Sequence, residues 1–392
     1  MDKRKLVFNS AIVLYFIIGL EILIMISPFA GFFYSAFNPF LLELSHHAAT
    51  KWLSAFFLPH MVVPPNGLLK FIRVSGSVLF LGGLAMFFMC AAQVYFNKLF
   101  KKGTALKGLY AFIRHPQYLG LAISGVGLFI LWPRFLVVVL WGVMVLLYLL
   151  LAKDEERRML KDFPEDYGRY MERTGMFLPR GVEKYLMPAG MTGKITVALL
   201  LAGLAIGGAF FLRGYTIGHL PLWSKGEIAV MAIVPGDLAI MEHRMPAILN
   251  LPQVKARLGA GRDYLVYFLP RNYIMQGLIA DTGGKWRLYK QHHAISMITD
   301  WIFHPFRHLS EGHHAMPGAS HAAMGGQAAL TRRLIFLEIK DAGSSLPDGL
   351  FAINARRIPV FMLDINVHDL QVAGLQDLPR ETGWGTVPTP VF

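Results

Sequence analysis

Two short segments of the sequence carry side chains that could do chemistry together. The first, from Gly108 to Gly120, reads GLYAFIRHPQYLG, and the second begins at Glu155 and Glu156 and ends in a Tyr-x-x-Tyr pattern at Tyr170. Adjacent carboxylates can offset the charge of a cationic ligand, and arginine and histidine can form hydrogen bonds with its polar groups. Tyrosine rings can wall an apolar or flat group. The two segments together supply carboxylates, hydrogen-bonding groups and aromatic walls.

These segments also resemble the membrane methyltransferases related to isoprenylcysteine carboxyl methyltransferase and phosphatidylethanolamine N-methyltransferase. In the first segment the matching positions are Gly108, Tyr110, Arg114, His115, Pro116, Tyr118 and Gly120. After two apolar runs, the matching positions are Glu155, Glu156, Leu160, Phe163, Tyr167, Tyr170, Phe177 and Pro179. The resemblance covers roughly residues 71–190, and the remainder of the chain resembles no family that we identify.

The resemblance implies that the protein transfers a methyl group from S-adenosylmethionine to a lipid-like acceptor in the membrane. An isoprenoid or carboxylate, or a phospholipid amine, would each fit an apolar tunnel that opens into lipid. In the family the two segments close over the cofactor. The positions to which this role is carried over are Gly108, Tyr110, Arg114, His115, Pro116, Tyr118, Gly120, Glu155, Glu156, Tyr167 and Tyr170.

Two residues are candidates for a catalytic role, depending on the acceptor. Methyl transfer from a sulfonium needs no metal, because the leaving group departs neutral; the site must align donor and acceptor and exclude water. A carboxylate acceptor would need a cation to position it, and Arg173 is the candidate. An amine acceptor would need to lose a proton, and Glu156 is the candidate base.

Each of these residues also has a purely structural interpretation. Glu155 and Glu156 could belong to an exposed charged helix end. Arg114 could extend along apolar surface to the membrane interface, and His115 could cap a helix. The tyrosines could form an interfacial aromatic belt, and the glycines could permit turns or close packing.

Two other classes of function compete with a methyltransferase. Membrane reductases that use NADPH carry a similar Arg-His-Pro-x-Tyr loop, although Gln117 occupies a position that is often Asn in them. A non-enzymatic assembly or metal-binding subunit with a vestigial core is the second alternative. The ordered pair of segments, with the Glu-Glu and Tyr-x-x-Tyr patterns, favours a methyltransferase over both.

Composition places most of the first half of the chain in a membrane. The chain has 392 residues, of which 54% are hydrophobic, and a formal net charge of +13. The basic residues lie beside apolar runs, which favours anionic lipid headgroups over nucleic acid as their partner. A single cysteine, Cys90, excludes an intrachain disulfide and a cysteine-rich metal site.

The fold class predicted is an α-helical multi-pass membrane domain of about five transmembrane helices plus a C-terminal α+β or β-rich extramembrane domain. The five apolar runs are Leu6 to Ile26, Phe71 to Phe96, Tyr118 to Trp132, Phe135 to Ala152 and Ile195 to Leu212. The first run is taken as a retained anchor rather than a signal peptide, since no small-residue cleavage site follows it. Gly76, Gly82 and Gly83 in the second run would permit close helix contact.

Only Pro133-Arg134 separates the third and fourth runs, which predicts a helical hairpin with Pro116 near its first turn. The expected domains are 1–190, methyltransferase-like; 191–212, an additional transmembrane helix; and 213–392, extramembrane. If all five runs span, the basic clusters share one side, so that side is predicted to be cytoplasmic. The C-terminal domain would then lie on the opposite side, which is the periplasmic side of the inner membrane in a bacterium.

The C-terminal region combines strand-like runs with a histidine-rich stretch. The runs EIAVMAIV, DYLVYFL, LIFLEI and VFMLDINV are separated by Pro, Gly and Asp, which is typical of a sheet. Half of the fourteen histidines lie between residues 292 and 321, and His304 and His308 have a spacing that could bring both to one ion on a helix. No known ligand spacing is matched, so solvated surface is the favoured interpretation and no metal site is predicted.

Overall fold

The computed structural model describes residues 44, 47–59, 66–100, 107–271, 279–280, 286–287, 330–341 and 348–378. These residues fall into two compact units, which are described separately. The first unit contains Ser75–Phe211, and the second contains Leu41–Val74 and Leu212–Phe392. The first expected span, Leu6 to Ile26, and the histidine-rich stretch 292–321 lie outside the described residues.

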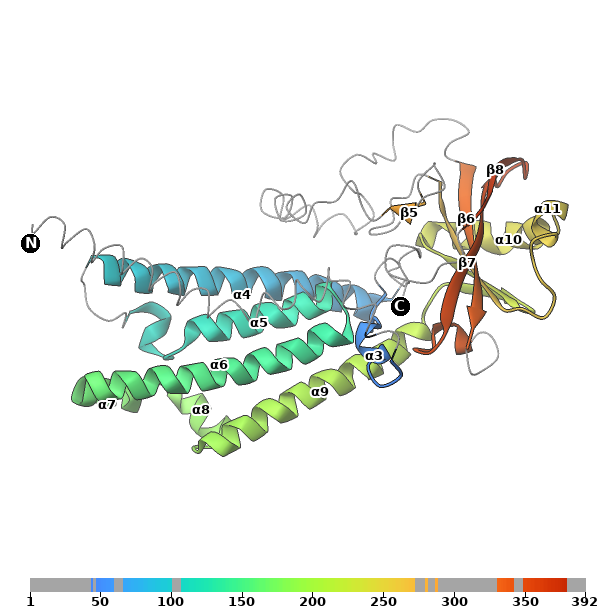
Figure 1. Ribbon diagram of the computed structural model, residues 1–392. Coiled ribbons are helices and arrows are strands. Elements are labelled where there is room, and N and C mark those ends of the chain that lie inside the picture. Colours follow the sequence, from blue (N-terminus) through green and yellow to red (C-terminus); the bar gives the residue numbers. More distant parts are fainter. Residues whose placement is uncertain are drawn as a thin grey trace, which may run out of the picture. The chain divides into compact units, whose positions relative to one another are not determined.

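The first unit is built on four apolar helices that run alongside one another (Figure 1): α4 (Gly67–Leu99), α5 (Pro116–Leu131), α6 (Phe135–Asp162) and α9 (Met191–Ile217). Among the described residues, α4, α6 and α9 are long and apolar enough to cross a membrane. At a rise of about 1.5 Å per residue, the 16 residues of α5 reach only about 24 Å, which is short of a hydrocarbon core of about 30 Å. Four predicted runs are therefore helices, whereas the count of five spans stays a prediction.

Close packing of α4 on α5 depends on glycine. A Cβ atom added to Gly120 would lie 2.8 Å from the carbonyl oxygen of Gly83 and 2.9 Å from the backbone nitrogen of Phe87. An added Cβ at Gly76 would approach Ile130 in the same way, whereas Gly82 faces open space. Of the three glycines named in the second apolar run, Gly76 and Gly83 thus lie where α4 approaches α5 closely, as their small size predicts, and Gly82 does not.

The residues of the candidate site lie in the elements at the ends of the apolar helices. The 3-10 helix η1 (Gly108–Ala111) precedes α5, which begins at Pro116, where the missing N–H of proline costs no helical hydrogen bond. Helix α6 continues past the apolar run as a polar helix to Asp162. The short helices α7 (Pro164–Arg173) and α8 (Arg180–Leu186) then lead to α9.

The second unit contains a six-stranded sheet in the order β1-β2-β3-β6-β7-β8. The strands are β1 (Leu222–Lys225), β2 (Ile228–Ala232), β3 (Tyr264–Pro270), β6 (Thr331–Lys340), β7 (Arg356–Asn366) and β8 (Val372–Asp377). Among the strands that the structure describes, only β2 and β3 pair in parallel, and the connection between them carries η2 (Pro235–Asp237), α10 (Leu238–Leu249) and α11 (Pro252–Lys255). The unit is completed by α3 (Lys51–Ser54), η4 (Asp348–Phe351) and the two-residue strands β4 (Ile279–Ala280) and β5 (Trp286–Arg287).

Both faces of the sheet are covered, which explains why its central strands are continuously apolar. Alternate residues of β3 point to opposite faces, as the two-residue period of a strand requires. Val266 packs in the cluster that contains Met241 and Met245 of α10, while Tyr267 packs in the other cluster, with Phe351 of η4. The four predicted strand runs form β2, β3, β6 and β7, so the C-terminal region contains the predicted sheet with helices beside it.

Candidate active site

Backbone hydrogen bonds hold the loop before α5 against the segment after α7. Arg114 N–H donates to the carbonyl oxygen of Gly175 (2.9 Å), and His115 N–H donates to that of Met176 (3.0 Å). In return, Gly175 N–H donates to the carbonyl oxygen of Phe112 (3.2 Å). These bonds fix the side chains of Arg114 and His115 at the start of α5, beside the polar end of α6.

Four charged or ionisable side chains meet there: Arg114 and His115 from the loop, and Glu155 and Glu156 from α6. Arg114 Nε lies 2.6 Å from Glu156 Oε1, and His115 Nδ1 lies 3.3 Å from Glu155 Oε2. His115 Nε2 is 3.5 Å from Glu156 Oε1. The Glu156 residue is only 1% exposed, so the ion pair is shielded from water. We call these four residues the charged cluster.

The pKa of His115 responds to this neighbourhood in two opposing ways. Burial of the ring lowers the pKa, because it disfavours the charged imidazolium. The contacts with Glu155 and Glu156, and the negative charge of both, act in the opposite direction and raise the pKa above its ordinary value. The net effect is a pKa of His115 above the ordinary histidine value, so the folded surroundings favour the protonated ring.

Glu155 differs from Glu156 in how far it is enclosed. Its side chain is 38% exposed, against 2% for that of Glu156. Its Oε1 accepts a hydrogen bond from the hydroxyl of Tyr118 (2.7 Å), and its Oε2 faces His115. Because a carboxylate offers about four acceptor positions, Glu155 can still accept hydrogen bonds from a cationic ligand. It is thus the acidic group of the cluster that a ligand could reach.

Helix α7 closes one side of the cluster through two polar links. The Tyr170 hydroxyl donates to the carbonyl oxygen of Tyr110 (2.7 Å), and the Arg114 guanidinium donates to that of Thr174. Burial raises the pKa of Tyr170 to about 12, and it raises the pKa of Tyr167 further. Both phenols are therefore neutral at physiological pH and act as hydrogen-bonding walls.

The remaining predicted positions fall into different environments. Gly108 has φ of +65°, which favours glycine, and Gly120 faces α4 as described above. Pro116 is buried at the first position of α5. Arg173 lies exposed in the last turn of α7, and none of its contacts among the described residues joins it to the charged cluster. Its role in positioning an acceptor stays a prediction.

Sequence reasoning missed two features of the site. The ring of Tyr148 stacks on that of Tyr118 with centroids 4.9 Å apart. Since Tyr148, Ala152 and Glu156 are four residues apart in turn, helical periodicity alone could have placed all three on one face of α6. The other missed feature is an ion pair between Glu183 of α8 and Lys194 of α9, for which the sequence offers no comparable signal.

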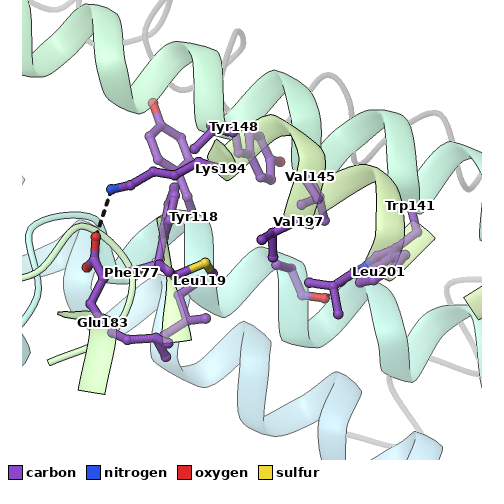
Figure 2. A pocket seen from close by; sticks show the side chains of 15 residues that line it. Tyr118, Leu119, Trp141, Val145, Tyr148, Phe177, Glu183, Lys194, Val197 and Leu201 are labelled. Carbon is purple, nitrogen blue, oxygen red and sulfur yellow. Dashed lines mark hydrogen bonds and ion pairs between the residues drawn. The ribbon is translucent and has the colours of Figure 1, made fainter. Parts of the chain in front are cut away.

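A cavity of about 180 Å³ adjoins the charged cluster within the first unit (Figure 2). Residues of α5, α6, α8, α9 and the segment before α8 line it, and most are apolar. Tyr118 belongs to both sites, because its ring lines the cavity while its hydroxyl binds Glu155. A group bound at the cluster and a molecule in the cavity would therefore share one wall.

Comparison with known proteins identifies the core of this unit. Residues 76–166 match the family described as phospholipid methyltransferase. No curated protein and no solved structure matches the chain. The matched stretch contains the whole charged cluster and ends just before Tyr167, so α7, α8 and α9 lie almost wholly beyond it. Residues 76–166 are thus similar to the phospholipid methyltransferase family, in agreement with the resemblance carried by the two segments.

Proposed function

We propose that this protein transfers the methyl group of S-adenosylmethionine to a lipid-like acceptor within the membrane. The observation that carries the proposal is the charged cluster. Glu155 and Glu156 meet Arg114 and His115 across about forty residues of sequence, and do so beside an apolar cavity. The match to the family points to methyl transfer to a membrane-associated acceptor. We infer the cofactor from the residues present.

The residues of the cluster fit this cofactor in charge and in the kinds of group that they offer. Glu155 can accept hydrogen bonds from an ammonium group and offset a sulfonium charge, since its carboxylate is partly exposed. Tyr118, Tyr167 and Tyr170 supply neutral aromatic and hydroxyl groups around it. When bound, S-adenosylmethionine supplies an electrophilic methyl group whose C–S bond breaks, with the electron pair left on a neutral sulfur, as the acceptor forms its new bond to carbon.

The two glutamates then have different tasks. Glu156 is paired with Arg114 and buried, so taking a proton from an amine acceptor would break that ion pair. We assign to it the task of holding Arg114, and through Arg114 the loop and α7, in place. Glu155 is the partner of the ligand, and the Tyr118 hydroxyl orients its carboxylate.

Binding measurements on the purified full-length protein test the cofactor assignment. We expect S-adenosylmethionine to bind and NADPH not to bind, which separates a methyltransferase from a membrane reductase. Glu155→Gln keeps the shape of the side chain but removes its charge, so it should weaken binding at least about tenfold. Glu172→Gln, an exposed position on α7, is the matched control and should bind normally. Equal affinity in the two variants would contradict the role of Glu155.

The methyl acceptor can be identified from the methylated product of the reaction. Membranes that contain the protein are incubated with methyl-labelled S-adenosylmethionine, and the labelled lipids are then identified by mass. Label in a methyl ester would indicate a carboxylate acceptor, and label in an N-methyl headgroup would indicate an amine. Absence of labelled product together with normal cofactor binding would favour the non-enzymatic alternative.

A further inference from the structure

The cavity beside the charged cluster is elongated along two helices. Its lining includes Trp141 and Tyr148 of α6, and Lys194 and Leu201 of α9, which are seven residues apart on each helix. At about 1.5 Å per residue, each pair spans about 10 Å. Figure 2 shows Trp141 and Leu201 at one end of the cavity and Tyr148 and Lys194 at the other. The helices therefore run antiparallel past a channel that has two distinct ends.

The end at Trp141 and Leu201 is apolar, whereas the opposite end carries the charged groups of the lining. Lys194 Nζ lies 2.8 Å from Glu183 Oε1, and the two side chains are only 15% and 14% exposed. Glu183 Oε2 also accepts a hydrogen bond from the backbone N–H of Met176. Both oxygens of Glu183 are thus engaged by the protein.

Lys194 is less fully engaged than its partner. An ammonium has three N–H donors, and within the described part of the chain Lys194 contacts the carboxylate of Glu183 and, weakly, the sulfur of Met176 at 3.9 Å. The Lys194 ammonium therefore keeps an N–H group that can donate to a molecule in the cavity. A ligand oxygen, above all an anionic one, is the partner that it would bind.

The polar end of the cavity is also the end next to the charged cluster. Tyr118 lines the cavity and binds Glu155, and the ring of Phe177, another lining residue, lies 6.0 Å from that of His115. The apolar end extends away from the cluster along α6 and α9, both of which are long enough to span a membrane. An amphiphile would fit with its polar group near the cluster and its chain along these helices.

We propose that this cavity binds the hydrocarbon chain of the methyl acceptor, and that Lys194 selects acceptors with an anionic oxygen group. The inference rests on the proposed function, because it takes the cluster as the place of methyl transfer. Lys194 and the α9 wall lie outside the stretch matched to the family, so they make acceptor choice a property of this chain.

A photoactivatable probe tests the cavity directly. The probe is an eight-carbon fatty acid with a diazirine in its chain, a length that matches the cavity's span of about 10 Å, and its amine analogue serves as the second arm. Purified full-length protein in lipid nanodiscs is irradiated with each probe, and labelled residues are located by mass spectrometry. We expect the carboxylate probe to label lining residues of α6 and α9. An alkyl phosphate of equal length is the third arm and separates carboxylate from phosphate selection.

Four variants make the result specific. Ala198→Trp fills the cavity and should lower labelling of the lining by about tenfold, whereas Leu204→Trp, an exposed position of α9, should not change it. Lys194→Gln should lower labelling by the carboxylate probe about tenfold without lowering labelling by the amine. Val145→Phe is a second, smaller filling change if the Ala198 variant does not fold.

The outcomes separate this inference from the proposed function. Normal binding of S-adenosylmethionine, with equal labelling in the wild type and both filling variants, would overturn the cavity as the acceptor site and leave the function intact. An equal decrease in labelling by the carboxylate probe and by the amine probe in Lys194→Gln would overturn the proposed selectivity for anionic groups. A wild type that is labelled in the cavity but binds no S-adenosylmethionine would overturn the function, and with it the occupant's identity as an acceptor.

Discussion

Arg114 and Glu156, 42 residues apart in sequence, form a buried ion pair in which Nε lies 2.6 Å from Oε1. Their side chains are 7% and 2% exposed. The same guanidinium donates to the carbonyl oxygen of Thr174 after α7. One arginine therefore joins the loop before α5, the polar end of α6 and the segment after α7. This side chain adds to the backbone hydrogen bonds that hold the loop before α5 against the segment after α7.

Removing one partner of this pair should destabilise the protein strongly. Glu156→Gln leaves the buried guanidinium without its counter-charge, and breaking a buried pair in this way typically costs about 3 to 5 kcal/mol. Asp166→Asn is the matched control, because its pair with Arg169 on α7 is exposed and should contribute no more than about 1 kcal/mol. Chemical unfolding in detergent measures both. Similar losses in the two variants would show that the ion pair is not critical.

Gly120 offers a packing prediction with an internal control. A methyl group in Gly120→Ala would press on the backbone of α4 at 2.8 Å, where no flexible side chain can move aside. Such overpacking typically costs about 1 to 3 kcal/mol. Gly82→Ala faces open space in a helix and should be neutral or stabilising by about 0.5 to 1 kcal/mol. Thermal unfolding that ranks the two variants the other way would contradict the close α4–α5 contact.

The Tyr118 hydroxyl can be tested apart from its ring. Tyr118→Phe keeps the stacking on Tyr148 but removes the hydrogen bond to Glu155, which is worth about 0.5 to 1.5 kcal/mol. Cofactor affinity should therefore fall by roughly two- to tenfold, while the cavity wall is retained. Tyr185→Phe, at an exposed position of α8, is the control and should bind normally. Unchanged affinity in Tyr118→Phe would mean that Glu155 needs no orientation by this hydroxyl.

The sequence predicts those features of the site that neighbouring residues encode, and it does not predict those that depend on tertiary packing. The helices follow from apolar runs, and the meeting of Arg114 with Glu156 was anticipated only because the two motifs occur together in a resembled family. The Glu183–Lys194 pair was not predicted, since α8 and α9 adjoin in space through packing that no local pattern encodes. Arg173 shows the converse: a suitable residue type is exposed and joins no contact of the cluster in the described part of the chain.

The last prediction concerns pH and His115. The charged groups around its ring are Glu155 and Glu156 of α6, and Arg114 beside it in the loop. Because these carboxylates raise its pKa in the folded state, protonation of His115 favours folding. The contribution is fully present below the ordinary histidine pKa of about 6.5 and is lost as the pH rises through the higher folded pKa.

His115→Gln isolates this contribution, since glutamine keeps a polar side chain but does not titrate. The free energy of unfolding of the wild type should exceed that of the variant most at about pH 6 and by progressively less toward pH 9. The same substitution at His219, which is exposed, stacks on Tyr215 and lies outside the charged cluster, is the control for loss of a histidine as such. A difference between wild type and His115→Gln that grows as the pH rises would show that His115 is held neutral in the folded protein, and that the charged cluster carries a net negative charge.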